Sequence, residues 1–477
     1  MTSDLDVAVV GAGASGLAVA YALQQAGRSV DVLESAEQVG GRMRTLRHDG
    51  YLIDQGADMI GTHGYATTWK LIRQVGLSDE DVPRIPSPVA LWREGRAHPN
   101  VGRPLGLFTG AGLSLRARLE MVRFNAFVTS RARAFQADHP ESTPLGDMTV
   151  AELAGRYCRE VSDYVFQPLV GGLFGWEAER SAAAPLVCLL LATRSTATWR
   201  TYREGMDTLA RRLAEVVHIT PRCAVQEVTS ASHNARLVTS EGAFTARSVV
   251  LCVPAPVALD LHVNAPEDER PYLRACTYTP MLRVSCGLQR RLAVQGAPSA
   301  YGVLIPAAED DLLSGIAVEH NKASGRAPEG RGLVSLFTRP VATRELIDAS
   351  DQEVVQRVTE QSERYLPGLG QAAHTHFVHR FRYGLPEATP AALRFRPDFL
   401  RRPTRAVEYA GDWVALQPAS EGAFRSADLA AARIQAHSAE PGDSASSKQR
   451  TPKRITPGGR LRGSGLYLES FEERRQP

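Results

Sequence analysis

The stretch from Val7 to Glu34, VAVVGAGASGLAVAYALQQAGRSVDVLE, constrains the fold of this chain more than any other part. It opens with a short continuous apolar run, Val7–Val10, as expected for a strand buried on both faces of a parallel sheet. A helical run follows, and Val30–Leu33 then predicts a second buried strand. Three glycines between the first strand and the helix have the spacing G-x-G-x-x-G, at Gly11, Gly13 and Gly16. Such glycines permit a tight turn, the approach of a pyrophosphate to the backbone, and close packing of the helix on the strand.

The acid at the end of the second strand narrows the choice of ligand. A helix N-terminus presents free N–H groups and the positive end of its dipole to a phosphate, so Ala14 and Ser15 are expected contacts. Glu34 can accept hydrogen bonds from both ribose hydroxyls and would repel a 2′-phosphate, and Ser35 beside it belongs to the same expected site. The sequence therefore predicts an unphosphorylated adenine dinucleotide, FAD or NAD.

Composition excludes several other classes of protein. The chain has 477 residues, of which 43% are apolar, so two domains are expected. Its 55 Lys and Arg nearly balance its 52 Asp and Glu, which argues against a nucleic-acid partner. The six cysteines lack C-x-x-C spacing and the histidines lack metal-ligand spacing, so neither disulfides nor a metal site are expected. This usage suits a reducing cytoplasm, and no apolar run is long enough to form a transmembrane segment. Nothing in the pattern indicates an oligomeric state.

A second glycine turn, Gly40-Gly41-Arg42, follows the β-α-β unit, and the step Asp54-Gln55-Gly56-Ala57 comes soon after. These elements resemble the GGR and D-x-G-A motifs of the flavin-dependent amine oxidase superfamily, which includes protoporphyrinogen oxidases, monoamine oxidases and carotenoid-type desaturases. In that family the GGR element runs beside the pyrophosphate and the flavin. The resemblance implies FAD as the cofactor, with Gly41, Arg42, Gly56 and Ala57 in its site.

A later segment, residues 222–256, also resembles a part of this family. It alternates apolar and polar residues and ends in an apolar strand, like the family's β-meander that returns to the FAD-binding sheet. In that meander Val225 would lie near the adenine. An ordinary β-hairpin is the alternative for this segment.

The segment 407–434 resembles the family's closing motif, A-G-D followed by E-G-A and a helix. There Asp412, with Gly411 beside it, would contact the ribityl or phosphate groups. A helix N-terminus at the flavin N1–C2=O edge would stabilise the negative charge of the reduced flavin. The backbone N–H groups implied at that edge are those of Gly422, Ala423 and Phe424.

The resemblance covers about residues 5–437 and implies an α/β fold. A Rossmann-like FAD-binding domain of the GR2 type would be interleaved with an α+β substrate-binding domain. The FAD-binding domain would consist of residues 1–85, 205–256 and 400–437. The substrate domain would consist of a mostly helical part, 86–204, and a second part, 257–399. Residues 438–477 are rich in Ser, Gly, Pro, Lys and Arg, and are expected to form a disordered tail.

The chemistry expected from this resemblance is hydride transfer. A flavin of this type accepts a hydride at N5 from a carbon next to nitrogen, or from an allylic or methylene-bridge carbon. We therefore expect an FAD-dependent oxidase or dehydrogenase that acts on a small molecule and is reoxidised by oxygen or another acceptor. No second nucleotide motif implies NAD(P)H. Monoamine oxidases attach their flavin through a cysteine in the segment corresponding to residues 382–393, but no cysteine follows Cys286 here, which predicts non-covalent FAD.

Departures from the family patterns bear on the branch of the family. Monoamine oxidases have an aromatic pair over the flavin, at positions that Leu385 and Ala419 occupy here. Many amine oxidases also have a lysine near N5, where the matching strand of this chain offers Arg283. Arginine stays charged and cannot act as a base, so no catalytic base is identified. Arg283 would either anchor a substrate carboxylate or point to solvent.

Other elements favour the protoporphyrinogen and coproporphyrinogen oxidase branch. Residues 163–187, which contain PLVGGLF, and the pair Leu385-Pro386 resemble that branch, although a specialised-metabolism oxidase on the same scaffold also fits. Porphyrinogens carry propionates that arginines could bind, and surface positions are the alternative for the same residues. These are Arg380, Arg382, Arg394 and Arg396. Three alternatives stay open: a flavin amine oxidase, a carotenoid- or squalene-type desaturase, and an FAD-binding protein without redox turnover.

Overall fold

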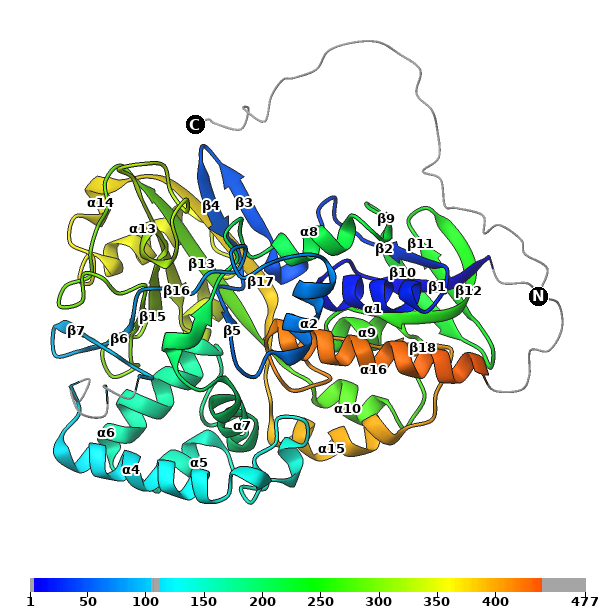
Figure 1. The fold of residues 1–477 in the computed structure, drawn as a ribbon, viewed down its shortest axis with the longest axis horizontal. Helices are drawn as coiled ribbons and strands as arrows, with labels where there is room; N and C mark the ends of the chain where they lie inside the picture. The colour runs from blue at the N-terminus through cyan, green and yellow to red at the C-terminus, as the bar shows by residue number, and fades with distance from the viewer. Residues whose placement is uncertain (1–3, 104–105, 107–111, 440–477) are drawn as a thin grey trace, which may run out of the picture.

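Two seven-stranded sheets and a helical region make up the protein (Figure 1). The computed structural model describes residues 4–103, 106 and 112–439, so the tail expected from residue 438 lies almost entirely outside the described residues. The α/β fold class predicted from the sequence is confirmed, since parallel and antiparallel strands combine with helices as expected. Among the residues described, no helix is both long and apolar enough to cross a membrane.

The first sheet has the predicted β-α-β unit at its centre. Its strand order is β10-β11-β12-β1-β2-β9, and β18 also pairs with β12. The pairs β1–β2, β1–β12, β2–β9 and β12–β18 are parallel, whereas β10, β11 and β12 form an antiparallel meander. The strands are β1 (Leu5–Val10), β2 (Val30–Leu33), β9 (His218–Thr220), β10 (Val225–Ser230), β11 (Ala235–Thr239), β12 (Gly242–Leu251) and β18 (Val407–Tyr409).

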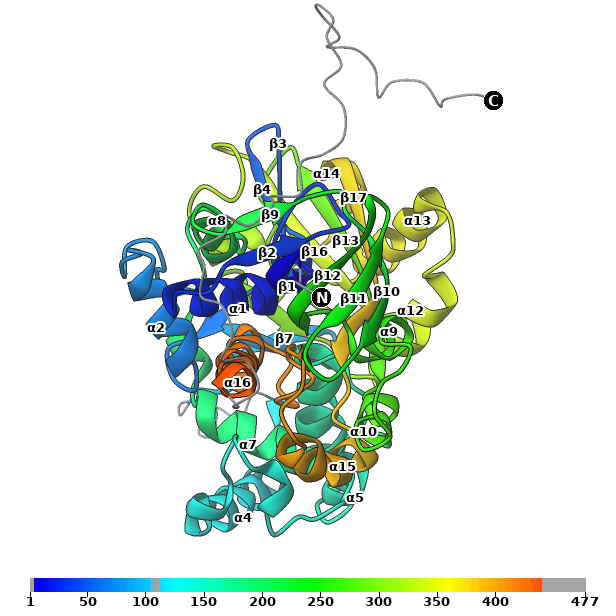
Figure 2. The ribbon, with the colours of Figure 1, turned by 90° about the vertical axis from the view of Figure 1, so that its right-hand side faces the viewer.

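Both faces of β1 are buried, which explains its continuous apolar run. Val7 and Val9 belong to a core that includes helices α1 (Ala14–Gln25) and α16 (Ser420–Ala439). Ala8 and Val10 belong to a second core, which continues into the helical region. Figures 1 and 2 show α1 and α16 lying close together against the first sheet, although they come from opposite ends of the described chain.

The second sheet has the order β17-β13-β16-β15-β14-β6-β7. Its longest pairing is antiparallel, between β13 and β17, and brings Arg283 opposite His379. Side chains from α12, α13 and α14 complete the core on one of its faces. The strands are β6 (Val89–Arg93), β7 (Arg96–Pro99), β13 (Tyr278–Leu288), β14 (Gly302–Leu304), β15 (Leu313–Val318), β16 (Gly332–Thr338) and β17 (Ala373–Pro386).

The remaining elements connect and cover the two sheets. Helices α4 to α7 form the helical region at the lower left of Figure 1. Two short pairs of strands are β3 (Thr45–His48) with β4 (Tyr51–Asp54) and β5 (Ile60–Gly61) with β8 (Trp199–Arg200). The other helices are α2 (Ala66–Gln74), α4 (Leu115–Ser130), α5 (Val150–Ala154), α6 (Arg159–Val161), α7 (Ala183–Thr193), α8 (Thr208–Ala214), α9 (Ala255–Leu261), α10 (Arg270–Ala275), α11 (Glu319–Lys322), α12 (Pro340–Leu346), α13 (Asp351–Ser362), α14 (Leu369–Ala372) and α15 (Pro390–Arg401).

The amphipathic pattern of residues 115–137 predicts one helix over that range, but α4 is shorter. It ends at Ser130, because Arg131 leaves the helical conformation with φ −118° and ψ 18°. The sequence of residues 147–158 begins like a capped helix, and α5 is present there, with a capping box between Thr149 and Glu152 at its start. The segment that contains PLVGGLF forms two π-helical turns rather than a regular helix.

The two sheets draw on the segments that the sequence assigned to two domains. Strands of the first sheet come from residues 5–33, 218–251 and 407–409, all within the segments predicted for FAD binding. Strands of the second sheet come from residues 89–99 and 278–386, within the segments predicted for substrate binding. The domain limits themselves stay a prediction.

Candidate active site

The first glycine turn is tight on one side and open on the other. Gly11 has φ +98°, and a Cβ at this residue would lie 3.0 Å from the carbonyl oxygen of Cys252. A Cβ at Gly16 would lie only 1.9 Å from the Gly11 carbonyl oxygen. By contrast, a Cβ at Gly13 would meet no atom within 4 Å. The open side of the turn is therefore beside Gly13, where the sequence predicted a pyrophosphate.

The N-terminus of α1 opens onto the same space. Gly13 is its N-cap in an extended conformation, no side chain caps the helix, and no acid lies in its first turn. The first N–H groups of a helix have no partner within the helix, so those of Ala14 and Ser15 can serve an anion. The N-terminus of α1 and the glycine turn therefore fit the pyrophosphate of a dinucleotide.

Glu34 ends β2 with its carboxylate folded over the glycine turn. One oxygen accepts from the Ala12 N–H at 2.7 Å, and the other accepts from the Ala36 N–H at 2.8 Å. The Ser35 hydroxyl donates weakly to the same carboxylate at 3.3 Å. Two carboxylate oxygens offer about four acceptor positions, of which these contacts use three, so about one is left for a ribose hydroxyl.

The second glycine turn lies directly on the first. The Gly40 N–H donates to the Ala12 carbonyl at 2.8 Å, and a Cβ at Gly41 would lie 3.3 Å from the Gly13 Cα. Both Gly40 and Gly41 have positive φ, which disfavours any residue with a side chain. We call the space bounded by these two turns the glycine crevice, defined by Gly11, Gly13, Gly40 and Gly41.

Arg42 joins the second turn to the C-terminal motif. Its guanidinium makes two parallel hydrogen bonds of 2.8 Å to Asp412 and donates to the Gly384 carbonyl at 2.9 Å. Burial by itself lowers the pKa of Arg42, but the Asp412 carboxylate more than offsets this, so the pKa is raised. A bidentate pair of this kind fixes orientation as well as charge. It therefore connects segments that the sequence assigned to the cofactor site and to the substrate domain.

Gly56 and Ala57 lie against the backbone of Arg42. The Ala57 N–H donates to the Arg42 carbonyl at 3.0 Å, and a Cβ at Gly56 would lie 2.2 Å from the same oxygen. The structure thus brings together the glycine-rich steps that the sequence identified.

Helix α16 begins at Ser420. For Ala423 and Phe424 to present free N–H groups to a flavin, the helix would have to begin later in the chain. The Ala423 N–H donates to the Ala419 carbonyl at 3.1 Å and is therefore used within the helix. The prediction that the Ala423 N–H is free is wrong for this reason, whereas Gly422 is still within the first turn and Phe424 lies one residue further into the helix. Contacts of these residues with a flavin stay a prediction. A Cβ at Gly422 would lie 2.2 Å from the Gln417 carbonyl, which explains the glycine.

Val225 lies at the start of β10, paired with Thr239 beside a β-bulge. The residues just before it are tied to the acid of the β-α-β unit, because the Cys223 N–H donates to the Glu34 carbonyl at 2.8 Å. The segment is a meander of the first sheet and not an isolated hairpin. A contact of Val225 with adenine stays a prediction.

A charged cluster lies next to the glycine crevice. Three carboxylates and three cations meet there, and five of the six side chains are at most 1% exposed. Asp58, at 20%, is the sixth. The members are Asp54, Asp58, Arg283, Glu319, Lys322 and Arg326. Sequence reasoning had singled out only Asp54 and Arg283, and Asp58 could have been found from its place directly after the D-x-G-A step.

Lys322 is at the centre of this charged cluster. Its ammonium nitrogen lies 3.0 Å from Asp54, 3.2 Å from Asp58 and 3.2 Å from Glu319. These three carboxylates are close enough together to hold a metal ion, but the ammonium occupies the position between them. Burial by itself lowers the pKa of Lys322, but the three carboxylates raise it by more, so the pKa is raised overall and the ammonium stays charged. Arg326 adds a 2.6 Å ion pair to Asp54.

Arg283 is completely enclosed and directed at the chain itself. It pairs with Asp58 at 3.0 Å and Glu319 at 2.5 Å, and donates to the Ser335 hydroxyl at 2.7 Å. The alternative that Arg283 points to solvent is therefore wrong. Its carboxylate partners in this structure are side chains of the chain, and contact with a substrate carboxylate stays a prediction. A weaker contact of 3.4 Å to the Gly56 carbonyl connects it to the glycine-rich loops.

The PLVGGLF segment and the Leu385-Pro386 segment meet beside Arg42. The Trp176 indole donates to the Pro386 carbonyl at 2.9 Å, and a Cβ at Gly175 would lie 3.3 Å from the Leu385 side chain. Gly384, which accepts from Arg42, immediately precedes Leu385. The two segments that resembled the porphyrinogen oxidase branch thus form one wall beside Arg42.

The four arginines considered for propionates are engaged within the chain. Arg380 pairs with Asp351 at 2.5 Å, Arg394 with Asp147 at 2.7 Å, and Arg382 with Asp348. Arg396 is buried and pairs with Glu141 at 2.8 Å. Surface ion pairs account for the first three, and a structural role for the last.

The sequence of this chain matches a known protein family. Residues 14–435 match the family described as flavin containing amine oxidoreductase. The match extends over nearly the whole described chain and includes Gly40 and Gly41 of the glycine crevice, the Arg42–Asp412 pair and the charged cluster.

Individual relatives are similar at low identity. A coproporphyrinogen III oxidase of Bacillus subtilis (strain 168) is 20% identical over 417 residues, covering 80% of this chain and 87% of the relative. One from Propionibacterium freudenreichii is 25% identical over 448 residues, covering 79% and 81%. The structure of a putrescine oxidase triple mutant superposes with a TM-score of 0.74 at 18% identity, covering 91% of this chain and 99% of that one. The last similarity is one of fold.

Proposed function

Because the chain belongs to the flavin containing amine oxidoreductase family, we propose that it binds FAD non-covalently and takes a hydride from a substrate carbon. The protein is an oxidoreductase that depends on a flavin and acts on a small molecule. The proposal concerns the identity of the cofactor, its non-covalent attachment and the class of substrate.

The observation that carries the proposal is the glycine crevice. Two glycine turns lie on each other, an uncapped helix N-terminus opens beside them, and Glu34 closes the end where a ribose would lie. These groups fit the pyrophosphate and ribose of a dinucleotide. The cysteines of the described residues are all free, and none occurs after Cys286, which supports non-covalent attachment and a cytoplasmic location.

When bound, the flavin would supply the hydride acceptor at N5, and the protein would supply binding, orientation and electrostatics. Arg42 and Asp412 hold the C-terminal motif against the second glycine turn, and Gly384 ties this pair to the segment that includes Leu385. The buried Trp176 packs that segment against the helical region and helps to exclude water. The ammonium of Lys322 keeps its proton among three carboxylates, so it is not poised as a base.

We favour an enzyme of the protoporphyrinogen or coproporphyrinogen oxidase type, or a specialised oxidase on that scaffold. The wall formed by the PLVGGLF and Leu385-Pro386 segments supports this choice, as does the similarity to coproporphyrinogen III oxidases. Leu385 and Ala419 are aliphatic where the amine oxidases have an aromatic pair, which weighs against that branch. Oxygen or another acceptor would reoxidise the flavin.

The test is the visible spectrum of the purified protein, repeated anaerobically with coproporphyrinogen, protoporphyrinogen and a panel of amines. Flavin bands that bleach with a tetrapyrrole support the proposal. Bleaching only with amines moves the protein to the amine oxidase branch, and flavin bands that never bleach leave a specialised oxidase or a non-redox FAD-binding protein. A colourless protein that FAD does not reconstitute overturns the cofactor assignment. After acid precipitation, FAD should remain in the supernatant if it is not covalently attached.

Variants of the crevice connect the spectrum to the site. Gly13→Val fills the open space beside the turn, and Glu34→Ala removes the predicted ribose acceptor, so both should purify without FAD. Glu37→Ala is the matched control, because Glu37 is an exposed acid in the same loop and pairs only with surface Arg222. If either crevice variant keeps a full complement of FAD, the placement of the cofactor is wrong.

A further inference from the structure

The hydroxyl of Tyr278 is a buried polar group that the fold leaves without a partner. Tyr278 is the first residue of β13, and its ring is only partly buried. Its hydroxyl oxygen is enclosed, however, and forms no hydrogen bond with any described residue. Most buried side-chain polar atoms in proteins have a partner, because a buried donor left unsatisfied costs free energy. This hydroxyl is therefore available to a bound molecule.

Contacts of the ring hold this hydroxyl in one place. Tyr278 pairs with Pro386 at one end of the ladder between β13 and β17. Its ring packs edge-on against the ring of Tyr383, with 5.7 Å between the centroids and an angle of 82° between the planes. Tyr383 is 40% exposed, so this pair of rings reaches the surface while the Tyr278 hydroxyl is buried. Edge-to-face packing of this kind fixes the direction of a tyrosine ring.

The hydroxyl lies beside the ion pair between Arg42 and Asp412. Burial raises the pKa of the Tyr278 hydroxyl well above 10, the Asp412 carboxylate raises it further, and the Arg42 guanidinium opposes the rise. Both charged groups are thus close enough to act on the phenolic proton. Because the hydroxyl keeps this proton, it is a hydrogen-bond donor.

Backbone contacts also bring the start of β13 close to Arg42. The Gly384 carbonyl accepts from the Arg42 guanidinium at 2.9 Å, and a Cβ at Gly384 would lie 2.8 Å from the carbonyl oxygen of Thr279. Thr279 directly follows Tyr278. The N–H of Ala255, at the start of α9, is near the hydroxyl without a hydrogen bond of ordinary geometry, and as a donor it cannot accept the phenolic proton.

The nearest carboxylate is already engaged. Each oxygen of Asp412 accepts from Arg42 at 2.8 Å, and the two opposite charges offset each other. A phosphate or hydroxyl oxygen placed beside this pair would find a neutral donor in the Tyr278 O–H. The ribityl and phosphate groups of FAD offer such oxygens, and the resemblance to the amine oxidase superfamily implies that Asp412 lies next to them.

We propose that the Tyr278 hydroxyl is a further cofactor contact, which donates a hydrogen bond to a ribityl or phosphate oxygen of FAD beside the Arg42–Asp412 pair. This inference rests on the proposed binding of FAD and adds to it a residue outside the glycine motifs. Tyr278 belongs to the second sheet, whose segments were predicted to bind substrate. The cofactor site would thus extend across both sheets.

The test is titration of the FAD-free full chain with FAD, followed by flavin fluorescence, for the wild type and for Tyr278→Phe. The substitution removes the hydroxyl and keeps the ring, so the dissociation constant of FAD should rise by about tenfold. Without FAD, Tyr278→Phe should unfold at the wild-type temperature or slightly above it, because an unpaired buried donor has been removed. With FAD, it should unfold at a lower temperature than the wild type, because it binds the cofactor less tightly.

Tyr365→Phe is the control for a structural hydroxyl. The Tyr365 ring is fully buried and packs edge-on against Trp92, as the Tyr278 ring does against Tyr383. Its O–H differs in having a partner, because it donates to Asp310 at 2.6 Å. Tyr365→Phe should therefore lower the unfolding temperature equally with and without FAD, and should leave the affinity for FAD unchanged.

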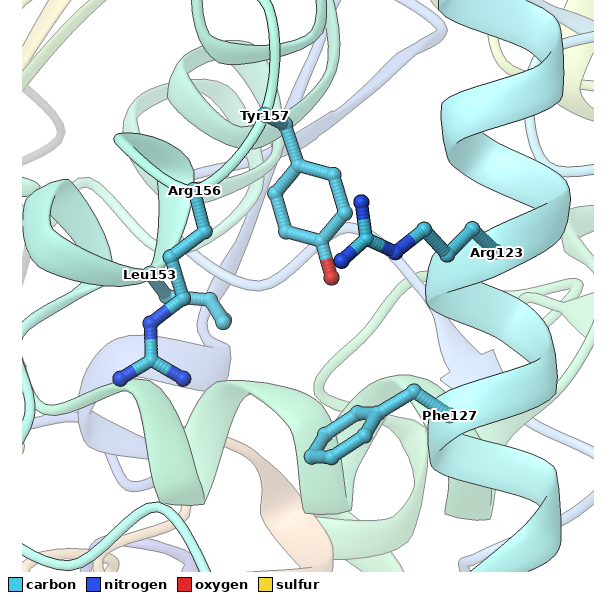
Figure 3. Close-up of a pocket in the computed structure, with 5 residues that line it drawn as sticks. All are labelled: Arg123, Phe127, Leu153, Arg156 and Tyr157. Atoms are coloured by element: carbon cyan, nitrogen blue, oxygen red, sulfur yellow. The ribbon is translucent and has the colours of Figure 1, made fainter.

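Tyr157→Phe is the control for a hydroxyl beside an arginine. Figure 3 shows the Tyr157 hydroxyl close to the Arg123 guanidinium, in a hollow of about 130 Å³ that is also lined by Phe127, Leu153 and Arg156. This hollow lies in the helical region, between α4 and the segment that follows α5, and is not part of the glycine crevice (Figure 1). Tyr157→Phe should bind FAD like the wild type.

The outcomes separate this inference from the proposed function. Equal affinity of the wild type and Tyr278→Phe for FAD overturns the inference and leaves the proposed function standing, whereas a wild type that binds no FAD overturns both. An unfolding temperature of Tyr278→Phe that is lowered equally with and without FAD shows a structural role and also overturns the inference. So does unchanged FAD affinity with slower bleaching by coproporphyrinogen, because the hydroxyl would then face the substrate.

Discussion

The glycine crevice is built from backbone atoms, whereas the charged cluster is built from ionised side chains that pair with one another. The crevice depends on the absence of Cβ atoms: at Gly16 one would overlap the Gly11 carbonyl at 1.9 Å. The charged cluster depends on balance, since three carboxylates face three cations. Gly56 connects the two regions: its carbonyl accepts from Arg283, and its Cα lies against the backbone of Arg42, directly after the second glycine turn. A site made of backbone atoms is sensitive to any added side-chain atom that changes its shape. A site made of buried charges is sensitive to any change in the number of positive or negative groups.

The largest effect should come from adding one methyl group to the first glycine turn. Gly16→Ala places a Cβ 1.9 Å from the Gly11 carbonyl, so the turn must open and FAD retention should fall by at least about 100-fold. Gly27→Ala, just beyond the far end of α1, is the control: Gly27 has a positive φ, but a Cβ there meets no atom within 4 Å, so the substitution should cost only about 1 kcal/mol of stability. The measurement is FAD content after gel filtration. Equal FAD content in both variants would show that the shape of the glycine turn does not determine FAD binding.

The next largest effect should come from upsetting the charge balance. Lys322→Met leaves three buried carboxylates facing two cations and should lower the free energy of unfolding by about 3–5 kcal/mol. Lys70→Met removes a lysine whose pair with Asp428 is 3.4 Å long and about half exposed, so its cost should stay below about 0.5 kcal/mol. Urea unfolding of both variants measures the difference. Similar stabilities would mean that the cluster tolerates an unpaired charge, so its stability would not depend on the balance of carboxylates and cations.

A buried neutral network extends the comparison to pH. The His262 ring lies 2.6 Å from the Tyr409 hydroxyl and 2.9 Å from the Ser230 hydroxyl. Burial, with help from Arg405 and Arg270, lowers the pKa of His262 from 6.5 to about 4. Between these pH values the unfolded chain binds a proton that the folded chain does not, so stability falls as pH falls through this window. The loss from this one group is at most about 3 kcal/mol.

His262→Gln isolates that contribution. The variant lacks the titrating ring, so its stability should decline less steeply than that of the wild type between pH 6.5 and about 4. Thermal unfolding at a series of pH values gives the two slopes. His233→Gln is the control, because His233 is exposed, and it should keep the wild-type slope. Parallel curves for wild type and His262→Gln would show that His262 does not set this pH dependence.

The smallest effect is expected on the solvent face of α4, where neither backbone shape nor buried charge is involved. Leu119→Ser should change the free energy of unfolding by no more than about 0.5 kcal/mol, because the side chain is 62% exposed. Phe124→Ala on the opposite face of the same helix should cost about 3 kcal/mol or more, because the ring is buried. Chemical unfolding of the two variants measures both costs. A large cost for Leu119→Ser would show that this solvent face contributes to the stability of the fold.

The contrast between the glycine crevice and the charged cluster also explains which parts of the molecule could be predicted from the sequence. The crevice could be predicted because its turn, helix and acid lie within residues 7–34, and local spacing fixes their geometry. The charged cluster could not, because Lys322 reaches Asp58 across 264 positions and no periodicity connects them. The helix start at Ser420 was missed for a related reason: the Ala419 carbonyl accepts from Ala423, and only the folded loop before it reveals this. The branch-specific wall was predicted as two segments, but not their contact.

The pairing of β18 with β12 also bears on the order in which this protein is made. Val407 and Tyr409 lie beside Val249 and Leu251, and Asp412 reaches Arg42 across 370 positions of the chain. During synthesis the glycine turns emerge long before the strand and the acid that complete their surroundings. A chain that stops short of β18 carries the glycine motif without the strand and the acid that complete the proposed cofactor site. Loading of the proposed cofactor would therefore report that synthesis has passed β18 and Asp412.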